Sequence, residues 1–452
     1  MRALIASRLN DDIVFLIMTF CPTFASLLDM MLVSKAFYRV YQTHPKSVNQ
    51  AVASNIFGPA LPQALRVIRY PYPACRSARD EEGLNLATAC PEEDISSGGI
   101  TAEEQQKLQE NAEVVQELED IYSLTQKDRT SETSVLTPAE SLRFQRATYR
   151  IMFYCNLFCA DINDREKDVQ LIRRQRTAVL SEYPTDELLQ LYAVVHFMRD
   201  ILEKVCTQDN NQSGMVDLLL SAGPYGVWRV WEDRSYEGIG DDLDFGRLDE
   251  DEDDRLYEGY FSLALASIWA ARQVPPPNGD DGSPTKWILD TIIGADDTCS
   301  HCAAPGGFSL LTEANWHRLR LSSWPTEFLK GELNITEAVT RPFEAAVRYM
   351  QDPWHDWGAF FSCVFDYAMP KIKASSPSEW SGWERDQSYC ERCFSKFLKE
   401  YTWQWFLEER VKDGWVPPDN CGFGYNCKTM VEDDEHAEAK NHLCVPSKNE
   451  FS

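Results

Sequence analysis

The residues best suited to chemistry in this sequence are cysteines and histidines near its carboxyl end. Cys421, Cys427, His436 and His442 follow one another with five, eight and five residues between them. Two thiolates and two imidazoles form a tetrahedral donor set for zinc, and a segment with few apolar residues gains folding free energy from a bound metal. We therefore predict a structural zinc ion held by these four side chains. Unligated thiols and surface histidines remain the alternative, and Cys444 offers a substitute for a histidine ligand.

The residues around Cys421 and Cys427 also follow a known pattern. Phe423 and Gly424 stand between the two cysteines, so that the segment resembles the poly(ADP-ribose)-binding zinc finger, C-x-(F/Y)-G-x-x-C followed by H-x5-H. Here the gap from the second cysteine to the first histidine is two residues longer, and residues 428–429 replace the family's aromatic–arginine pair. The intervening residues 432–435 are all acidic and would repel an anionic polymer. We predict a structural finger and leave poly(ADP-ribose) binding open.

Two further cysteine pairs have the spacing of zinc knuckles. Cys299 and Cys302 form one pair, Cys390 and Cys393 form the other, and 87 residues separate the inner cysteines. Four cysteines in two C-x2-C pairs suit a shared zinc ion. The second pair also fits one face of a helix with the phenylalanines that follow it, so that buried core thiols are the alternative.

The elements that position such groups are predicted to be helices, and the clearest helical pattern lies near the amino end. Asn10 can cap a first helix whose first turn contains Asp11 and Asp12. After a break at Cys21 and Pro22, a second apolar helical stretch leads into a third. A segment this short cannot bury its own apolar side chains, and these side chains therefore need to pack on the rest of the protein or on a partner. The residues that carry the resemblance described next, and that it predicts to bind a partner, are Leu9, Ile13, Leu16, Ile17, Phe20, Leu27, Leu28, Leu32, Val33, Lys35 and Phe37.

The order of these residues is similar to the F-box, with an isoleucine-led helix, a leucine-rich helix and a closing V-S-K-x-F over residues 33–37. Residues 51–62 look like the continuation found in F-box-like proteins that are abundant in filamentous fungi. Asn10 stands where the family usually has proline. The resemblance implies docking on a Skp-type adaptor protein, and hence a substrate receptor that brings an unknown client protein to a cullin-type ubiquitin ligase.

Composition narrows the classes of partner. Acidic residues exceed basic ones by 27, which opposes contact with nucleic-acid phosphates, and no run of 18 apolar residues predicts a membrane span. Residues 13–20 resemble the apolar part of a signal peptide, but Asp11 and Asp12 directly before them oppose the cationic start that it requires. We expect neither a nucleic-acid nor a membrane partner. We expect the chain to work in the cytoplasm, the nucleus or both, where its cysteines are thiols or metal ligands.

The fold is predicted to be all-α, because apolar residues recur at helical spacing and no run alternates as a strand does. Capping boxes are expected at Thr101 and Thr137, and one long helix from about Thr185 to Cys206. The expected segments are an F-box-like module (1–70), a linker (71–100), a helical body (101–405) with a solvated acidic loop (241–254), and a zinc-finger-like tail (406–452). Trp380 and Trp383, three residues apart, are expected to pack in the core one helical turn from each other.

No recognised catalytic motif is present. The sequence contains no P-loop, no dinucleotide-binding glycine pattern, no H-E-x-x-H and no G-x-S-x-G, and the H-x-E at His436 and Glu438 has no P-C-x-x-C downstream. We therefore predict a non-catalytic receptor. The alternatives are a zinc-containing enzyme of unknown reaction and a helical scaffold without a link to a ligase.

Overall fold

The structure, a computed structural model, describes residues 10–72, 91–92, 95, 98–131, 133–158, 169–206, 213–233, 235–236, 238–239, 257–277, 283–313, 315–316, 325–348, 358–374 and 379–448. Within these ranges the chain forms α-helices and short 3-10 helices, with isolated bridges but no strand. The predicted all-α fold is confirmed. Leu9 and the predicted acidic loop lie outside the described residues. None of the helices described has both the length and the apolar character that crossing a bilayer requires.

The chain forms two compact units, each built from segments that are distant in the sequence. The first unit combines Met1–Glu119 with Leu136–Asp290, and the second combines Asp120–Val135 with Thr291–Ser452. The boundaries predicted near residues 70, 100 and 405 fall within these units.

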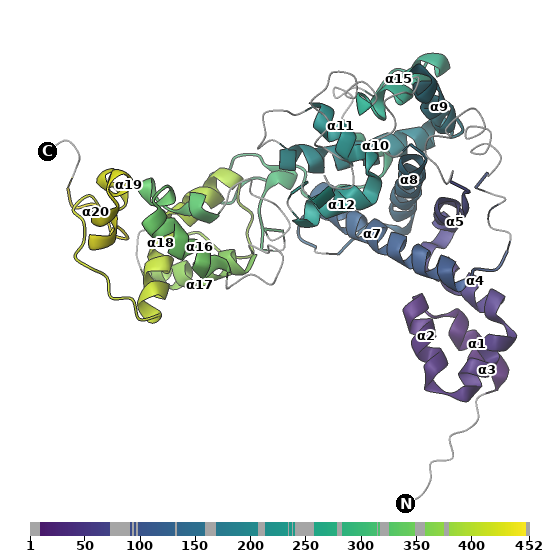
Figure 1. Cartoon of the computed structure of the whole chain (residues 1–452), viewed down its shortest axis with the longest axis horizontal. Coiled ribbons are helices and arrows are strands. Elements are labelled where there is room, and N and C mark those ends of the chain that lie inside the picture. Colours follow the sequence, from purple (N-terminus) through teal and green to yellow (C-terminus); the bar gives the residue numbers. More distant parts are fainter. Residues whose placement is uncertain are drawn as a thin grey trace, which may run out of the picture. The chain divides into compact units, whose positions relative to one another are not determined.

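The helices of the first unit run from the amino end to α15 (Figure 1). They are α1 (Asp11–Thr19), α2 (Phe24–Val33), α3 (Lys35–Thr43), α4 (Pro45–Phe57), η1 (Gly58–Ala60), α5 (Leu61–Arg69), the start of α7 (Ala102–Gln126), α8 (Pro138–Leu157), α9 (Val169–Ser181), α10 (Thr185–Cys206), α11 (Ser213–Ser221), α12 (Gly223–Asp233), α15 (Ser262–Arg272) and η6 (Pro284–Trp287).

Local sequence explains where several of these helices begin. The Asn10 side chain accepts from the backbone N–H of Asp12 and caps α1, and Thr137 forms the expected capping box with Glu140 at the start of α8. A capping box also joins Thr101 and Glu104 before α7. These caps satisfy backbone N–H groups that have no partner inside a helix.

The three amino-terminal helices form a small module on α4. Helix α3 packs on α1 and on α2, and all three helices pack against α4. Helix α4 continues through η1 into α5, which packs on α8. Val14 and Met18 of α1, Leu27 of α2 and Val52 of α4 are buried among the helices of this module. The module is therefore attached to the rest of the first unit through α4 and α5.

The rest of the first unit is centred on α8 and α10. These two helices pack together and also contact α12, and α10 packs on α11. The buried Tyr154 hydroxyl of α8 donates to the carbonyl of Tyr260, and the Tyr260 hydroxyl donates to the carbonyl of Phe158. Each buried hydroxyl thus has a hydrogen-bond partner, which avoids the cost of burying an unsatisfied polar group.

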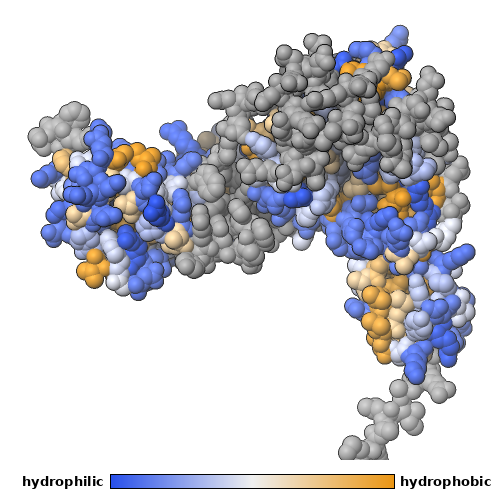
Figure 2. All heavy atoms as spheres, in the orientation of Figure 1, coloured by the Kyte–Doolittle hydropathy of each residue, from blue (hydrophilic) through white to orange (hydrophobic). Residues whose placement is uncertain are grey.

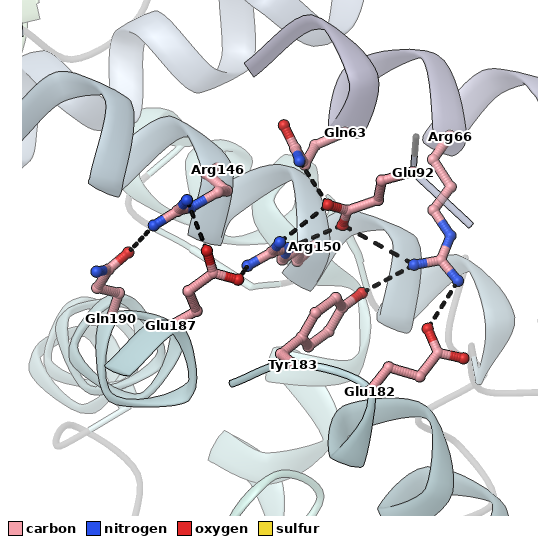
Figure 3. A network of polar contacts seen from close by, with 9 residues as sticks. All are labelled: Gln63, Arg66, Glu92, Arg146, Arg150, Glu182, Tyr183, Glu187 and Gln190. Carbon is pink, nitrogen blue, oxygen red and sulfur yellow. Dashed lines mark hydrogen bonds and ion pairs between the residues drawn. The ribbon is translucent and has the colours of Figure 1, made fainter. Parts of the chain in front are cut away.

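A network of three arginines and three glutamates links the predicted linker to these helices (Figure 3). Its members are Gln63, Arg66, Glu92, Arg146, Arg150, Glu182, Tyr183, Glu187 and Gln190. The Glu92 carboxylate accepts from Arg150 Nε and Nη2 at 2.8 and 2.9 Å, and also from Gln63 of α5. The linker was expected to be loose, but Glu92 within it is held firmly to α5 and α8.

The second unit surrounds an aromatic core. Its helices are η7 (Gly307–Ser309), η8 (Pro325–Phe328), η9 (Gly331–Asn334), α16 (Glu337–Arg348), α17 (Gly358–Ala374), α18 (Glu391–Lys412), η10 (Gly424–Asn426), α19 (Thr429–Glu432) and α20 (Asp434–Ala439). Trp383 stacks on Phe397 of α18 with ring centroids 4.2 Å apart, and on Tyr389 on its other side. Trp380 and Trp383 are buried as expected. Trp380 lies in a turn and Trp383 in the loop that follows it, before α18 and outside any helix, so the helical prediction for them was wrong.

Candidate metal centres and docking face

The cysteines and histidines of the tail converge on one point. Cys421 precedes η10, Cys427 follows it, His436 lies in α20, and His442 comes after that helix. One donor atom from each of these residues lies within 4.8 Å of the others. The sequence therefore predicted a cluster that the structure brings together, and this cluster could hold a metal ion.

The separations between His436 and the other three donors of this Cys2His2 cluster match a tetrahedral ion. Metal–sulfur bonds of about 2.3 Å and metal–nitrogen bonds of about 2.0–2.1 Å place sulfur about 3.6 Å from nitrogen, and two nitrogens about 3.4 Å apart. His436 Nε2 lies 3.7 Å from Cys421 Sγ, 3.4 Å from Cys427 Sγ and 3.2 Å from His442 Nε2. The three separations that involve His436 therefore agree with a single tetrahedral ion, and the remaining donor atoms lie within 4.8 Å of one another.

Tight backbone turns hold these ligands. Gly424 has a positive φ of 49°, and a Cβ there would lie 2.2 Å from the Cys444 carbonyl oxygen. Cys421 N–H donates to the Asn441 carbonyl, which joins the start of the tail to its end. Glycine is therefore required at position 424 by both conformation and space.

The environment favours a neutral imidazole at His442. Burial of the ring, followed by the charge of the neighbouring His436, lowers the pKa of His442. A neutral ring can present a lone pair to a metal. Burial raises the pKa of the Cys427 thiol, although backbone N–H groups of Met430 and Thr429 oppose that shift.

Cys444 is not part of this cluster. Its thiol donates to the carbonyl oxygens of Cys421 and Asn441, and burial raises its pKa. The substitute ligand that the sequence left open is therefore a supporting residue in this arrangement.

The two distant C-x2-C pairs also meet. Cys299 and Cys302 lie in the segment before η7, Cys390 stands at the N-cap position of α18, and Cys393 lies in the first turn of that helix. All four sulfurs are within 4.8 Å of one another. Burial raises the pKa of Cys299, but the backbone N–H groups of Cys390, Cys302 and His301 outweigh it and lower the pKa to about 7. This second cluster could also hold a metal ion.

The amino-terminal module leaves apolar side chains exposed. Leu16 is 54% exposed, Phe20 is 73% exposed and Leu32 is 76% exposed. Exposed side chains predicted to bind a partner also include Ile13, Ile17, Leu28, Val33 and Lys35. Figure 2 shows hydrophobic side chains, coloured orange, gathered on one side of this module. We call these eight residues the docking face.

Three predicted partner-binding positions are not among these eight residues. Leu27 is only 2% exposed, so it does not belong to the docking face, and its part in partner binding stays a prediction. Phe37 is half-buried in α3, and Leu9 lies outside the described residues.

Comparison with known proteins adds no relatives. No family model matches the chain, and no curated protein or solved structure matches it.

Sequence reasoning missed the residues that support the clusters. His301 stacks on Trp380 beside the four cysteines, and Arg129 holds the loop that contains Cys299. Neither contact has a signal in the sequence, because each joins residues that are far apart in the chain.

Proposed function

We propose that this protein is an F-box-like substrate receptor, in which α1–α3 bind a Skp-type adaptor of a cullin-type ubiquitin ligase. The helical remainder would bind a client protein, and zinc in the Cys2His2 cluster would stabilise the tail. Such a receptor works in the cytoplasm or nucleus, where these adaptors act.

The observation that carries the proposal is the docking face. Residues Ile13, Leu16, Ile17 and Phe20 recur at helical spacing along one side of α1 and are all exposed. Apolar side chains concentrated in this way mark an interaction site more often than a solvated surface. The order of residue types along α1–α3 resembles the F-box, which favours the adaptor as the occupant.

The two other functions have less support. A helical scaffold without a partner would bury the apolar sides of α1 and α2, whereas Leu16 and Leu32 are more than half exposed. A zinc enzyme needs a metal with an open coordination position. The Cys2His2 cluster offers four protein donors, which fill a tetrahedral shell and favour a structural role.

Capture of the full chain by a purified Skp-type adaptor tests the proposal. Burial of each leucine contributes about 1–2 kcal/mol, so changing Leu16 and Leu32 to Asp should weaken capture by about 30-fold or more. Leu263→Asp is the matched control, since Leu263 is an exposed leucine on α15, and it should leave capture unchanged. Failure of the unaltered chain to bind, or equal capture of the double variant, would overturn the adaptor proposal.

Zinc in the tail has its own test. Cys427→Ser removes one donor of the Cys2His2 cluster, so the purified variant should lose one zinc ion per chain by elemental analysis. Zinc content equal to that of the unaltered chain would show that the tail does not bind it.

A further inference from the structure

The second cysteine cluster is assembled by main-chain hydrogen bonds between two distant segments. Ser300 N–H donates to the Ser388 carbonyl at 2.9 Å. Leu311 and Tyr389 exchange two hydrogen bonds of 2.8 and 2.9 Å. These contacts place the chain around Cys299 directly beside the residues that precede Cys390.

The first C-x2-C pair lies in a tight turn. Cys299 N–H donates to the Ala304 carbonyl, and Ala303 N–H donates back to the Cys299 carbonyl, each at 2.8 Å. Ala303 has a φ of 56°, a conformation that is unfavourable for a residue other than glycine. The turn brings the sulfurs of Cys299 and Cys302 near each other despite this cost.

A buried arginine anchors the same loop from another segment of the second unit. Arg129 Nη1 donates to the carbonyl oxygens of Gly294 and Gly307, and Nη2 pairs with Asp297. Arg129 is 5% exposed. Residues 294–307 are therefore held at both ends, so that the position of the cysteines does not depend on a mobile surface loop.

The distance between sulfurs suits a shared ion. Two sulfurs on a tetrahedral zinc with bonds of about 2.3 Å lie about 3.8 Å apart, and Cys302 Sγ lies 3.7 Å from Cys390 Sγ. A disulfide would require about 2.05 Å. All four sulfurs lie within 4.8 Å of one another, and a tetrahedral sulfur set is typical of zinc or iron.

The histidine inside the first pair is directed to other partners. The His301 ring stacks on Trp380 with an interplanar angle of 18°, and Trp383 Nε1 donates to His301 Nδ1 at 3.2 Å. Because Nδ1 already accepts this hydrogen bond, His301 supports the turn while the cysteines supply the donors. The set consists of four sulfurs.

From this geometry we propose that Cys299, Cys302, Cys390 and Cys393 bind a second zinc ion. Four sulfur donors close its coordination shell, so the ion is structural. It fastens the loop before η7 to the start of α18, on which the aromatic core of the second unit packs. The ion is separate from the zinc proposed for the tail, and the inference does not depend on adaptor binding.

Metal content and cobalt spectroscopy of the full chain test this inference. The purified protein should contain two zinc ions per chain, and Cys302→Ser with Cys393→Ser should leave one. Cys363→Ser is the matched control, because Cys363 is half-buried in α17 outside both clusters, and it should retain two. Cobalt bound at the remaining site of the Cys427→Ser variant should show the intense thiolate-to-cobalt absorption of four sulfur ligands.

The zinc content of the unaltered chain and of the cysteine variants distinguishes the four-cysteine centre from the Cys2His2 centre. One zinc ion in the unaltered chain, lost with Cys427→Ser and retained with the Cys302/Cys393 double variant, would overturn the second centre alone. Iron in place of zinc at the four cysteines would overturn the identity of the ion. Measuring whether the unaltered chain contains two zinc ions does not require any variant to fold, so the inference can be refuted even if the double variant is unstable.

Discussion

Replacement of Glu92 by glutamine should loosen the connection between the predicted linker and the helices of the first unit. The carboxylate is 13% exposed and faces the guanidinium of Arg150, itself 7% exposed. A glutamine keeps the shape but turns an amide N–H2 toward these donors and removes the negative charge. The change therefore leaves buried positive charge partly uncompensated.

The loss of stability in Glu92→Gln can be estimated from the ion pairs that remain in the network. Removing one partner of a buried ion pair costs about 3–5 kcal/mol. Arg150 still pairs with Glu187, and Arg66 with Glu182, so we expect the lower end, about 3 kcal/mol. For a unit of this size that lowers the midpoint of thermal unfolding by about 6–12 °C.

Hydrogen exchange measured by mass spectrometry is the most direct assay, because it reports on α5 and α8 separately from the second unit. Glu92→Gln should speed exchange in both helices. Glu103→Gln is the control, since Glu103 forms an exposed ion pair with Lys107, and such pairs contribute little. Adding Arg150→Met to Glu92→Gln should cost less than the sum of the two single changes. Unchanged exchange in α5 and α8 would refute the assigned role of Glu92.

Three further outcomes are expected. Burial raises the pKa of Glu92, but its hydrogen bond and charge interaction with Arg150, together with its contacts to Gln63 and Arg66, outweigh burial and lower the pKa. The ionised Glu92 carboxylate therefore stabilises the folded chain above about pH 4.5, and this stabilisation is lost as the pH falls further. The stability difference between the unaltered chain and Glu92→Gln, measured by urea unfolding, should shrink below that pH, and a constant difference would contradict this. Ala303→Gly relieves the positive φ and should stabilise the second unit by about 0.5–1 kcal/mol; an unchanged or lower thermal midpoint would argue against strain there. Gly424→Ala should lower the free energy of unfolding by about 2 kcal/mol or more and weaken zinc retention against a chelating dye. Gly382→Ala, where an added Cβ meets nothing, should do neither. Equal zinc retention in both variants would contradict the close packing around position 424.

Local features were predictable because they depend on neighbouring residues. The capping box at Thr137, the cap at Asn10 and the helix Thr185–Cys206 all agree with the structure. Each relies on hydrogen bonds or apolar spacing within about one helical turn. The Cys2His2 cluster was also predictable, because its four residues lie in one segment, between positions 421 and 442, at a spacing that suits a zinc ion.

Long-range contacts were not predictable in this way. Nothing in the spacing of Cys302 and Cys390 shows that they meet, since their approach depends on hydrogen bonds made by Ser300 and Leu311 with a segment far along the chain. Glu92 looked like an ordinary charged residue in a polar stretch. Its role depends on Arg150, 58 residues away, and the spacing of apolar residues along the sequence does not indicate such a pair.

The four-cysteine cluster has a consequence for the order of events during synthesis. Cys302 and Cys390 lie 88 positions apart along the chain, and a ribosome adds about 5–20 residues per second. Cys299 and Cys302 therefore leave the ribosome about 4–18 s before Cys390 and Cys393, and during that interval two thiols stand without their partners. The cluster in the tail spans a much shorter stretch and is complete soon after its first ligand appears. The second unit thus acquires its long-range centre only when α18 is being made.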